Sequence, residues 1–397
     1  MAHGIALPRA QAPSIPIAAD RSARVPWYVW CCVLATTFAT IGGVWDISWH
    51  ESIGRDSFWT PAHLLIYLCG VLAGLGCGYL ILSTTFDPAS PLRGASVRLW
   101  GFRGPLGAFI AAWGGIAMIV SAPFDNWWHN AYGLDVKVLS PPHVVLILGL
   151  LSIRFGTLIL ILAAMNRATG PLRRRLDWLF LYIGALFLGG MIGAFMEQNL
   201  RVFMHGARFY LIAAIVVPLV LAAVARASSG RWAATLATAI LSLVTCLFVW
   251  ILPLVPAAPK LGPVYQNITH LVPPDFAKLF LFGALAFDLV RRLASRKSWS
   301  DWKLASLGGL AFLAAYIAVQ WPFADFLMSP ASRNWFFATQ NFPYMVPSSS
   351  EWVRNIFVPT ESSPAQFATR MAIAFLAAIL SARAGLAWGA WMRRVQR

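Results

Sequence analysis

The stretch that decides the fold is PWYVWCCVLATTFATIGGVWDISWH, residues 26–50, an apolar run that ends in Asp46 and His50. A second apolar run, PAHLLIYLCGVLAGLGCGYLILS, covers residues 61–83 and carries His63 at its start. Each run is long enough to cross about 30 Å of hydrocarbon as an α-helix that rises about 1.5 Å per residue. The two runs therefore predict a membrane-spanning helical hairpin with three potential ligand side chains near its turn.

Similar apolar runs recur along the whole chain. With 59% hydrophobic and only 12% charged residues, the chain is predicted to be an all-α polytopic integral membrane helical bundle whose environment is the lipid bilayer. Residues 26–166 are expected to form duplicated metal-site hairpins, and residues 167–397 further membrane helices with a long outer loop at about 323–367. We predict about ten spans, at residues 26–49, 61–83, 105–123, 142–165, 178–197, 208–225, 232–253, 274–291, 303–322 and 368–390.

The charge pattern predicts the topology. The net charge of +16 is not read as a sign of nucleic-acid binding, because the basic residues form short clusters between apolar runs, as topology signals do. By the positive-inside rule, both termini are expected in the cytoplasm of a bacterial inner membrane, and the Asp/His stretches at its periplasmic face. Residues 1–25 contain prolines and arginines but no apolar signal-peptide core, so we expect a disordered cytoplasmic tail.

The five cysteines lie inside apolar runs and lack the paired spacing of a zinc or redox motif. They are predicted to be membrane-buried thiols. They are Cys31, Cys32, Cys69, Cys77 and Cys246.

One pattern occurs twice in the first four runs: an Asp, a His four residues later, and a second His just behind a proline. Residues four apart share one face of a helix, and the hairpin brings back the third side chain. A single copy is as often a helix cap or an ion pair, but the duplication favours metal binding with open coordination positions. One carboxylate with two imidazoles suits Cu(II), Zn(II) or non-haem Fe(II), and the Irving–Williams order favours copper where it is available. The predicted ligand sets are Asp46, His50 and His63, and Asp125, His129 and His143, with Glu51, Asp56, Asn126, Asn130 and Asp135 as candidate outer groups.

Weaker echoes of the pattern follow, at Glu197 with His205 and at His270 with Asp275. They predict a hairpin repeat over residues 26–291 in which the later ligand positions have decayed. Arg154 falls near the middle of a predicted span, where an unpaired charge is costly. Two interpretations of Arg154 stay open: a structural pairing with Glu197 or backbone carbonyls, or a proton or substrate path.

The spacing Asp46-x3-His50-x12-His63 resembles the copper-ligand pattern of the membrane-embedded C subunit of the particulate methane and ammonia monooxygenases. The spacing Asp125-x3-His129-x13-His143 is similar to a second cluster of that family, which has an amide in the first position. The resemblance covers residues 41–150. It implies that each set binds copper and that one set is where dioxygen is activated for hydroxylation of a hydrocarbon or ammonia. Asp125 in place of the amide adds negative charge, which favours a divalent metal.

Three functions are compatible with these patterns. The first is a copper-dependent, monooxygenase-like oxidoreductase that takes electrons from quinol or a partner subunit. The second is a copper acquisition or transport protein, against which the sequence shows no Met-rich or Cys-rich relay of the soft ligands that Cu(I) prefers. The third is a metal-free transporter in which the Asp and His side chains couple protons. Partner subunits, a periplasmic copper or electron donor, and an oligomer are candidate partners.

Overall fold

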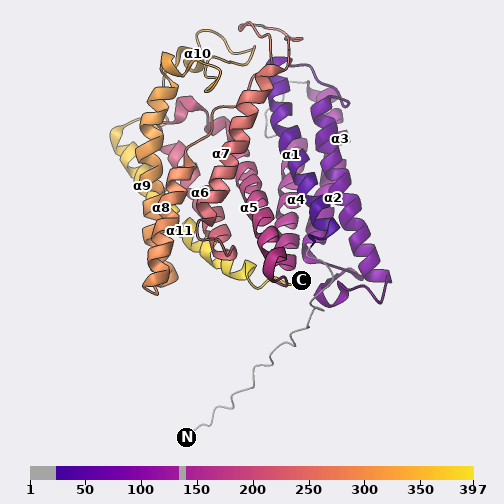
Figure 1. Cartoon of the computed structure of the whole chain (residues 1–397). Helices are drawn as coiled ribbons and strands as arrows, with labels where there is room; N and C mark the ends of the chain where they lie inside the picture. The colour runs from indigo at the N-terminus through magenta and orange to yellow at the C-terminus, as the bar shows by residue number, and fades with distance from the viewer. Residues whose placement is uncertain (1–23, 134–139) are drawn as a thin grey trace.

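The computed structural model describes residues 24–133 and 140–397 and consists of long helices packed side by side (Figure 1). Within those ranges, nine helices are long and apolar enough to cross a membrane. The predicted all-α polytopic membrane bundle is therefore confirmed. Its elements are α1 (Trp27–Ser52), α2 (Pro61–Phe86), η1 (Arg93–Ala95), β1 (Val97–Leu99), β2 (Phe102–Gly104), α3 (Leu106–Tyr132), α4 (Pro141–Met165), α5 (Gly170–Gly193), η2 (Met196–Gln198), η3 (Arg201–Phe203), α6 (Ala207–Ala227), α7 (Ala233–Ile251), η4 (Leu252–Leu254), α8 (Phe280–Arg296), α9 (Asp301–Leu327), η5 (Pro330–Ser332), α10 (Glu351–Arg354) and α11 (Pro364–Met392).

The predicted span at 274–291 differs most from the structure. Its helix, α8, begins only at Phe280 and has 17 residues, so it is about 26 Å long and shorter than the hydrocarbon layer. Pro273 and Pro274 precede it and supply no backbone N–H for a helix. The non-helical backbone before α8 instead bonds to side chains, as when the Leu279 N–H donates to Gln320 Oε1 at 2.8 Å. Such partners are what irregular backbone at membrane depth requires.

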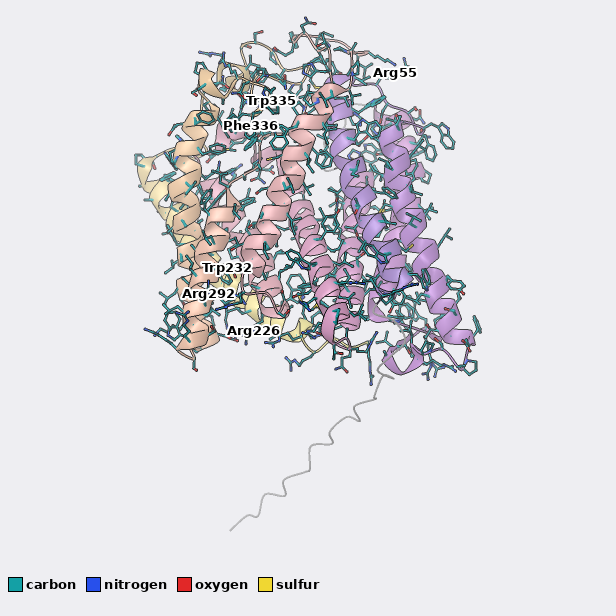
Figure 2. All side chains as sticks on the ribbon, in the orientation of Figure 1. Arg55, Arg226, Trp232, Arg292, Trp335 and Phe336 are labelled. Carbon is teal, nitrogen blue, oxygen red and sulfur yellow. The ribbon has the colours of Figure 1, made fainter. Side chains whose placement is uncertain are left out.

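Successive long helices run in opposite directions, so the turn of the α1–α2 hairpin lies at the same end of the bundle as α10 (Figure 1). We call this end the α10 end. Figure 2 shows Arg55, Trp335 and Phe336 there, and Trp232 and Arg292 near the opposite end. The Arg292 guanidinium lies 4.4 Å from the centre of the Trp232 ring. A cation and an aromatic ring at a helix end fit a membrane–water interface.

Small residues let the helices of the first hairpins approach closely. A Cβ added at Gly156 of α4 would lie 2.6 Å from both the Ala111 nitrogen and the Gly107 oxygen of α3. A Cβ at Gly114 of α3 would likewise lie 2.7 Å from the Gly149 oxygen of α4. Membrane helices commonly associate through such small residues, because lipid supplies no hydrophobic driving force between helices. The contact fixes α3 against α4 and thereby places the side chains at their α10 end.

The end of α1 is held on the face opposite Asp46 and His50. The Ser48 hydroxyl donates to the Val272 carbonyl at 2.6 Å, and the Val272 N–H donates to Ser52 Oγ at 2.7 Å. Residues 48 and 52 are one turn apart and lie roughly opposite residues 46 and 50 on a helix. These hydrogen bonds therefore fix the rotation of α1 about its axis.

The predicted outer loop at about 323–367 is shorter in the structure, since α9 continues to Leu327 and α11 begins at Pro364. Glu361 ties the end of this loop to the bundle: its Oε2 accepts the Ala207 N–H at 3.2 Å and its Oε1 accepts from Arg370 at 3.0 Å. Burial alone would raise the pKa of Glu361, but hydrogen bonds from Thr360, Arg370 and Ala207 outweigh burial and lower it. The loop is thus anchored by an ionised carboxylate.

Candidate metal centres

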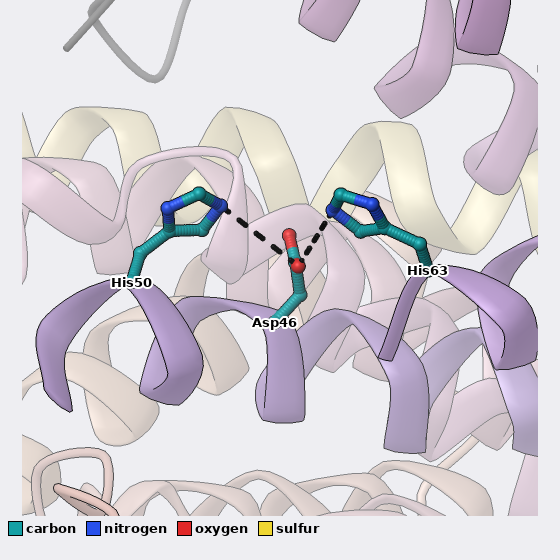
Figure 3. Close-up of side chains that lie close together, drawn as sticks. All are labelled: Asp46, His50 and His63. Carbon is teal, nitrogen blue, oxygen red and sulfur yellow. Dashed lines mark ion pairs between the residues drawn. The ribbon is translucent and has the colours of Figure 1, made fainter. Parts of the chain in front are cut away.

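The first predicted ligand set converges at the turn of the α1–α2 hairpin (Figure 3). His63 Nε2 lies 3.0 Å from Asp46 Oδ1, and His50 Nε2 lies 3.9 Å from the same oxygen. One ligand atom from each of the three side chains lies within 4.8 Å of the other two. We call this group site 1. Two rigid helices supply it, which suits a preorganised metal centre.

A second carboxylate belongs to site 1. Asp56 Oδ2 lies 3.5 Å from His50 Nε2 and 3.5 Å from His63 Nε2. The sequence placed Asp56 only among candidate outer groups, but its oxygen is as close to the imidazoles as that of a ligand. Its side chain is only 8% exposed. Site 1 therefore presents two carboxylates and two imidazoles.

The turn before α2 orients His63. The Thr60 hydroxyl accepts the Ser57 N–H at 2.8 Å, and the Ser57 carbonyl lies 2.9 Å from His63 Nδ1. A carbonyl can only accept, so Nδ1 carries a proton and Nε2 is the ring nitrogen that faces Asp46. Gly54 has a φ of 81°, which a glycine adopts without strain in this turn, and Pro61 opens α2. A hydrogen bond from the second ring nitrogen, here from His63 Nδ1 to the Ser57 carbonyl, is typical of metal-binding histidines.

The second predicted set converges in the same way at the end of α3, and we call it site 2. Asp125 Oδ2 lies 3.2 Å from His129 Nε2, and Asp125 Oδ1 lies 3.4 Å from His143 Nε2. His129 Nδ1 faces the Gly133 carbonyl at 3.3 Å, which repeats the orientation of His63. At the start of α4, the Ser140 hydroxyl accepts the His143 N–H at 3.5 Å. Site 2 thus repeats the geometry of site 1 with a single described carboxylate.

The candidate outer groups of site 2 contribute less than Asp56 does at site 1. The Asn130 amide donates to the Asn126 carbonyl on its own helix at 2.8 Å, and Asp135 lies outside the described residues. Glu51, next to site 1, interacts electrostatically with Asp275. The two sites therefore differ in charge within the described part of the chain.

Each site contains a carboxylate oxygen that faces an imidazole nitrogen: Asp46 Oδ1 in site 1 and Asp125 Oδ1 in site 2 lie 3.0–3.4 Å from an imidazole Nε2. A lone pair of nitrogen facing a carboxylate oxygen needs a proton or a cation between them, and a buried carboxylate needs a partner. Carboxylate oxygen and imidazole nitrogen are the donor set of divalent transition metals. The residues present therefore fit a metal ion at both sites.

Tyr67 connects the two sites. It lies one turn beyond His63 on α2, with a distance of 6.1 Å between the two ring centres. Its phenol interacts electrostatically with Asp125 of site 2 and with Asp46 and Asp56 of site 1. Tyr67 is not among the residues predicted from the sequence, although its position four residues after a candidate ligand, His63, is a usable signal. The two sites are thus neighbours across α2.

Three of the four weaker candidate ligands have other partners, and the fourth, Glu197, is exposed. Glu197 is exposed in η2, whereas His205 stacks between Trp321 and Phe357 and lies 3.3 Å from Asp325 Oδ1. The structure therefore does not pair Glu197 with His205.

His270 and Asp275 are likewise held separately. His270 Nε2 faces Asn341 Oδ1 at 3.2 Å, while Asp275 accepts the Arg201 N–H at 3.0 Å and lies 3.9 Å from Lys278 Nζ. In the described residues, neither pair belongs to a cluster of three or more potential ligands. The geometry gives no support to a ligand role for these four side chains.

Arg154 belongs to α4, and its side chain is buried against α1 and α5. Its Nη2 donates to Thr40 Oγ1 at 3.4 Å, and a Cβ added at Gly190 would lie 2.8 Å from its Nη1. The predicted pairing with Glu197 is absent, and no carboxylate within the described ranges forms an ion pair with Arg154. Its Nε has no hydrogen-bond partner there either. A buried cation without a counter-ion calls for a functional explanation.

No protein-family model, curated protein or solved structure matches this chain. The class of the protein follows from fold and site: a polytopic membrane protein with two groups of side chains suited to a metal ion.

Proposed function

We propose that this chain is a membrane metal-binding protein that holds one divalent ion, preferentially copper, at each of sites 1 and 2. The observation that carries the proposal is the twin arrangement of one carboxylate and two imidazoles, whose ligand atoms lie within 4.8 Å of one another at each site. An accidental helix cap or ion pair would not be expected to bring the same three residue types together twice in one chain.

Copper is preferred for two reasons. Imidazole and carboxylate ligands bind Cu(II) more tightly than the other common divalent metals when copper is present. The spacing of both sets also resembles the copper-ligand patterns of the particulate monooxygenase C subunit. Asp46 and Asp56 together would neutralise a divalent ion at site 1, which reduces the cost of holding it in partly buried surroundings.

We further propose that the α10 end faces the periplasm of a bacterial inner membrane. The opposite end carries clustered arginines, among them Arg226 and Arg292 (Figure 2), as the positive-inside rule requires of a cytoplasmic side. Both sites would then be reached from the periplasm, where a copper donor or an electron donor could dock. His50, with a side chain 40% exposed, gives site 1 its opening in that direction.

The activity proposed for the sites is that of a copper-dependent, monooxygenase-like oxidoreductase. Copper, when bound, would supply the redox chemistry with dioxygen, and quinol or a partner subunit would supply electrons. The chain's own contribution is to orient the imidazoles through the Ser57 and Gly133 carbonyls and to leave coordination positions open. In the turn between α1 and α2, Phe58 and Trp59 pack edge to face with ring centres 5.0 Å apart.

Metal binding is tested on the purified full-length protein by copper analysis and electron paramagnetic resonance. We expect about two Cu(II) ions per chain, with one lost in His50→Ala, one lost in His129→Ala and both lost in the double variant. His205→Ala is the matched control, because His205 lies outside both sites. Unchanged copper content in the double variant would refute the proposal.

A second function, copper acquisition, is favoured by one observation: sulfur atoms of different helices meet in pairs beneath site 1. Oxygen consumption with quinol by the copper-loaded protein supports the oxidoreductase. Copper uptake into proteoliposomes without oxygen consumption supports acquisition. Transport that ignores chelators and follows pH would overturn both in favour of a metal-free transporter.

A further inference from the structure

Two thiols meet inside the α1–α2 interface. Cys32 Sγ and Cys77 Sγ lie 3.4 Å apart, and both residues are fully buried. Their separation of 45 positions in the sequence hides the pair from any search for short cysteine motifs. Cys32 and Cys77 are the buried thiols that the sequence predicts, and the structure adds that they contact each other.

A second sulfur contact lies between this pair and site 1. Cys69 Sγ of α2 is 4.0 Å from Met118 Sδ of α3. Counted along α2 from His63, Cys69 lies about 9 Å and Cys77 about 21 Å deeper in the membrane. The same two helices that supply site 1 therefore carry sulfur ligands progressively further from it.

The chemistry of the Cys32–Cys77 pair differs from that of sites 1 and 2. Thiolate sulfur is a soft donor that selects Cu(I) and similar cations, whereas zinc in a structural site takes four ligands. Two sulfurs in a dry helix interface offer a low coordination number and no carboxylate oxygen. We propose that Cys32 and Cys77 form a binding site for a soft monovalent metal cation such as Cu(I).

Charge balance supports this site. Binding of one monovalent cation releases two thiol protons to the solvent, so the pair changes from neutral to a net charge of −1. Arg154 supplies a compensating positive charge: it interacts electrostatically with Cys69 and lies one turn from Thr157, whose Oγ1 is 3.5 Å from the Cys32 carbonyl. Charge compensation at the thiol pair would explain why the Arg154 guanidinium is buried without a carboxylate partner.

The test uses Ag(I), a redox-inert soft cation, on the full-length protein in lipid nanodiscs. We expect the wild type to bind one Ag(I) per chain that Cys77→Ser and Cys32→Ser each bind at least about 100-fold more weakly, because a hydroxyl is a hard donor. Cys246→Ser, which alters a half-buried thiol of α7, is the matched control. Equal Ag(I) binding in wild type and Cys77→Ser, or an equal loss in Cys246→Ser, overturns the site.

Two further measurements separate this site from sites 1 and 2. The variant with both His50→Ala and His129→Ala should keep the tight Ag(I) and lose Cu(II). X-ray absorption of the wild type loaded with Cu(I) under excess ascorbate should show sulfur neighbours, and their absence overturns the proposal even if the serine variants fail to fold. Arg154→Gln should keep both thiols but weaken Ag(I) binding at least about tenfold, since the compensating charge is gone. Unchanged affinity in Arg154→Gln overturns the role of Arg154.

Discussion

Asp56→Asn tests whether the second carboxylate of site 1 acts on the metal. A metal bound to His50 and His63 at about 2.0 Å from each Nε2 lies at most about 5.5 Å from Asp56 Oδ2, because that oxygen is 3.5 Å from both nitrogens. A divalent cation and a carboxylate at about 5.5 Å attract by about 1.5 kcal/mol even at the dielectric constant of water. Removing the charge should therefore weaken Cu(II) binding at site 1 at least about tenfold, and more where burial lowers the effective dielectric constant.

The assay isolates each site in turn. On the His143→Ala background, which leaves site 1 intact, competition with a chromophoric chelator should show the loss caused by Asp56→Asn. On the His63→Ala background, which leaves site 2, the same substitution should change affinity by less than about threefold, because Asp56 contacts no ligand of site 2. Asp325→Asn is the matched control for the same chemical change elsewhere at the α10 end. Equal losses at both sites, or none at site 1, would refute the assignment of Asp56.

Three other predictions concern the framework and are measured by thermal unfolding in detergent. Gly156→Val should destabilise the protein by about 1–3 kcal/mol or more, because its Cβ would meet the α3 backbone. Gly78→Val should not, since nothing lies within 4 Å of a Cβ added there. Similar losses of stability in both variants would contradict the packing argument. Ser52→Ala should cost about 1–3 kcal/mol because the Val272 N–H loses its acceptor, and an unchanged unfolding temperature would show that water replaces it. Glu361 has a lowered pKa in the folded state, so the stability it contributes is present above its ordinary pKa and is lost as pH falls through the folded pKa. Glu361→Gln should therefore lower the stability at pH 7 and flatten the dependence of stability on acid pH. Parallel pH profiles of the wild type and the variant would contradict this.

The positions of the membrane helices could be read from the sequence because apolar length alone determines them. The predicted runs at 26–49 and 61–83 correspond to α1 and α2, which end only a few residues later. The ends are harder to predict, because a helix continues wherever its backbone bonds are satisfied. Thus α5 begins at Gly170 instead of 178 and includes a polar, arginine-rich first part, since charged residues near a helix end reach the interface. α8 starts later than predicted because prolines and long-range hydrogen bonds keep the preceding segment non-helical. Hydropathy detects neither of these effects.

Of the candidate site, the sequence could predict only what helix periodicity and a short hairpin bring together. Those two rules are enough to group Asp46 with His50 and His63, and to repeat the group on α3 and α4. Asp56 lies in the turn, where no periodicity applies, so its approach to the imidazoles depends on the turn between the helices. The Cys32–Cys77 contact depends on how α1 crosses α2, and no local pattern encodes a crossing.

The hydrogen bonds of α1 explain why its metal-facing side can be preorganised. Asp46 and His50 face α2, while Ser48 and Ser52 on the other side are tied to the backbone of Val272. A rotation of α1 that moved the ligands would break both serine contacts and leave buried polar groups unsatisfied, at a cost of about 1–3 kcal/mol for each group. The segment before α8 remains non-helical where it meets these serines, so its free backbone groups are what hold the helix. The non-helical segment that precedes α8 is therefore the part of the fold that fixes site 1 in position.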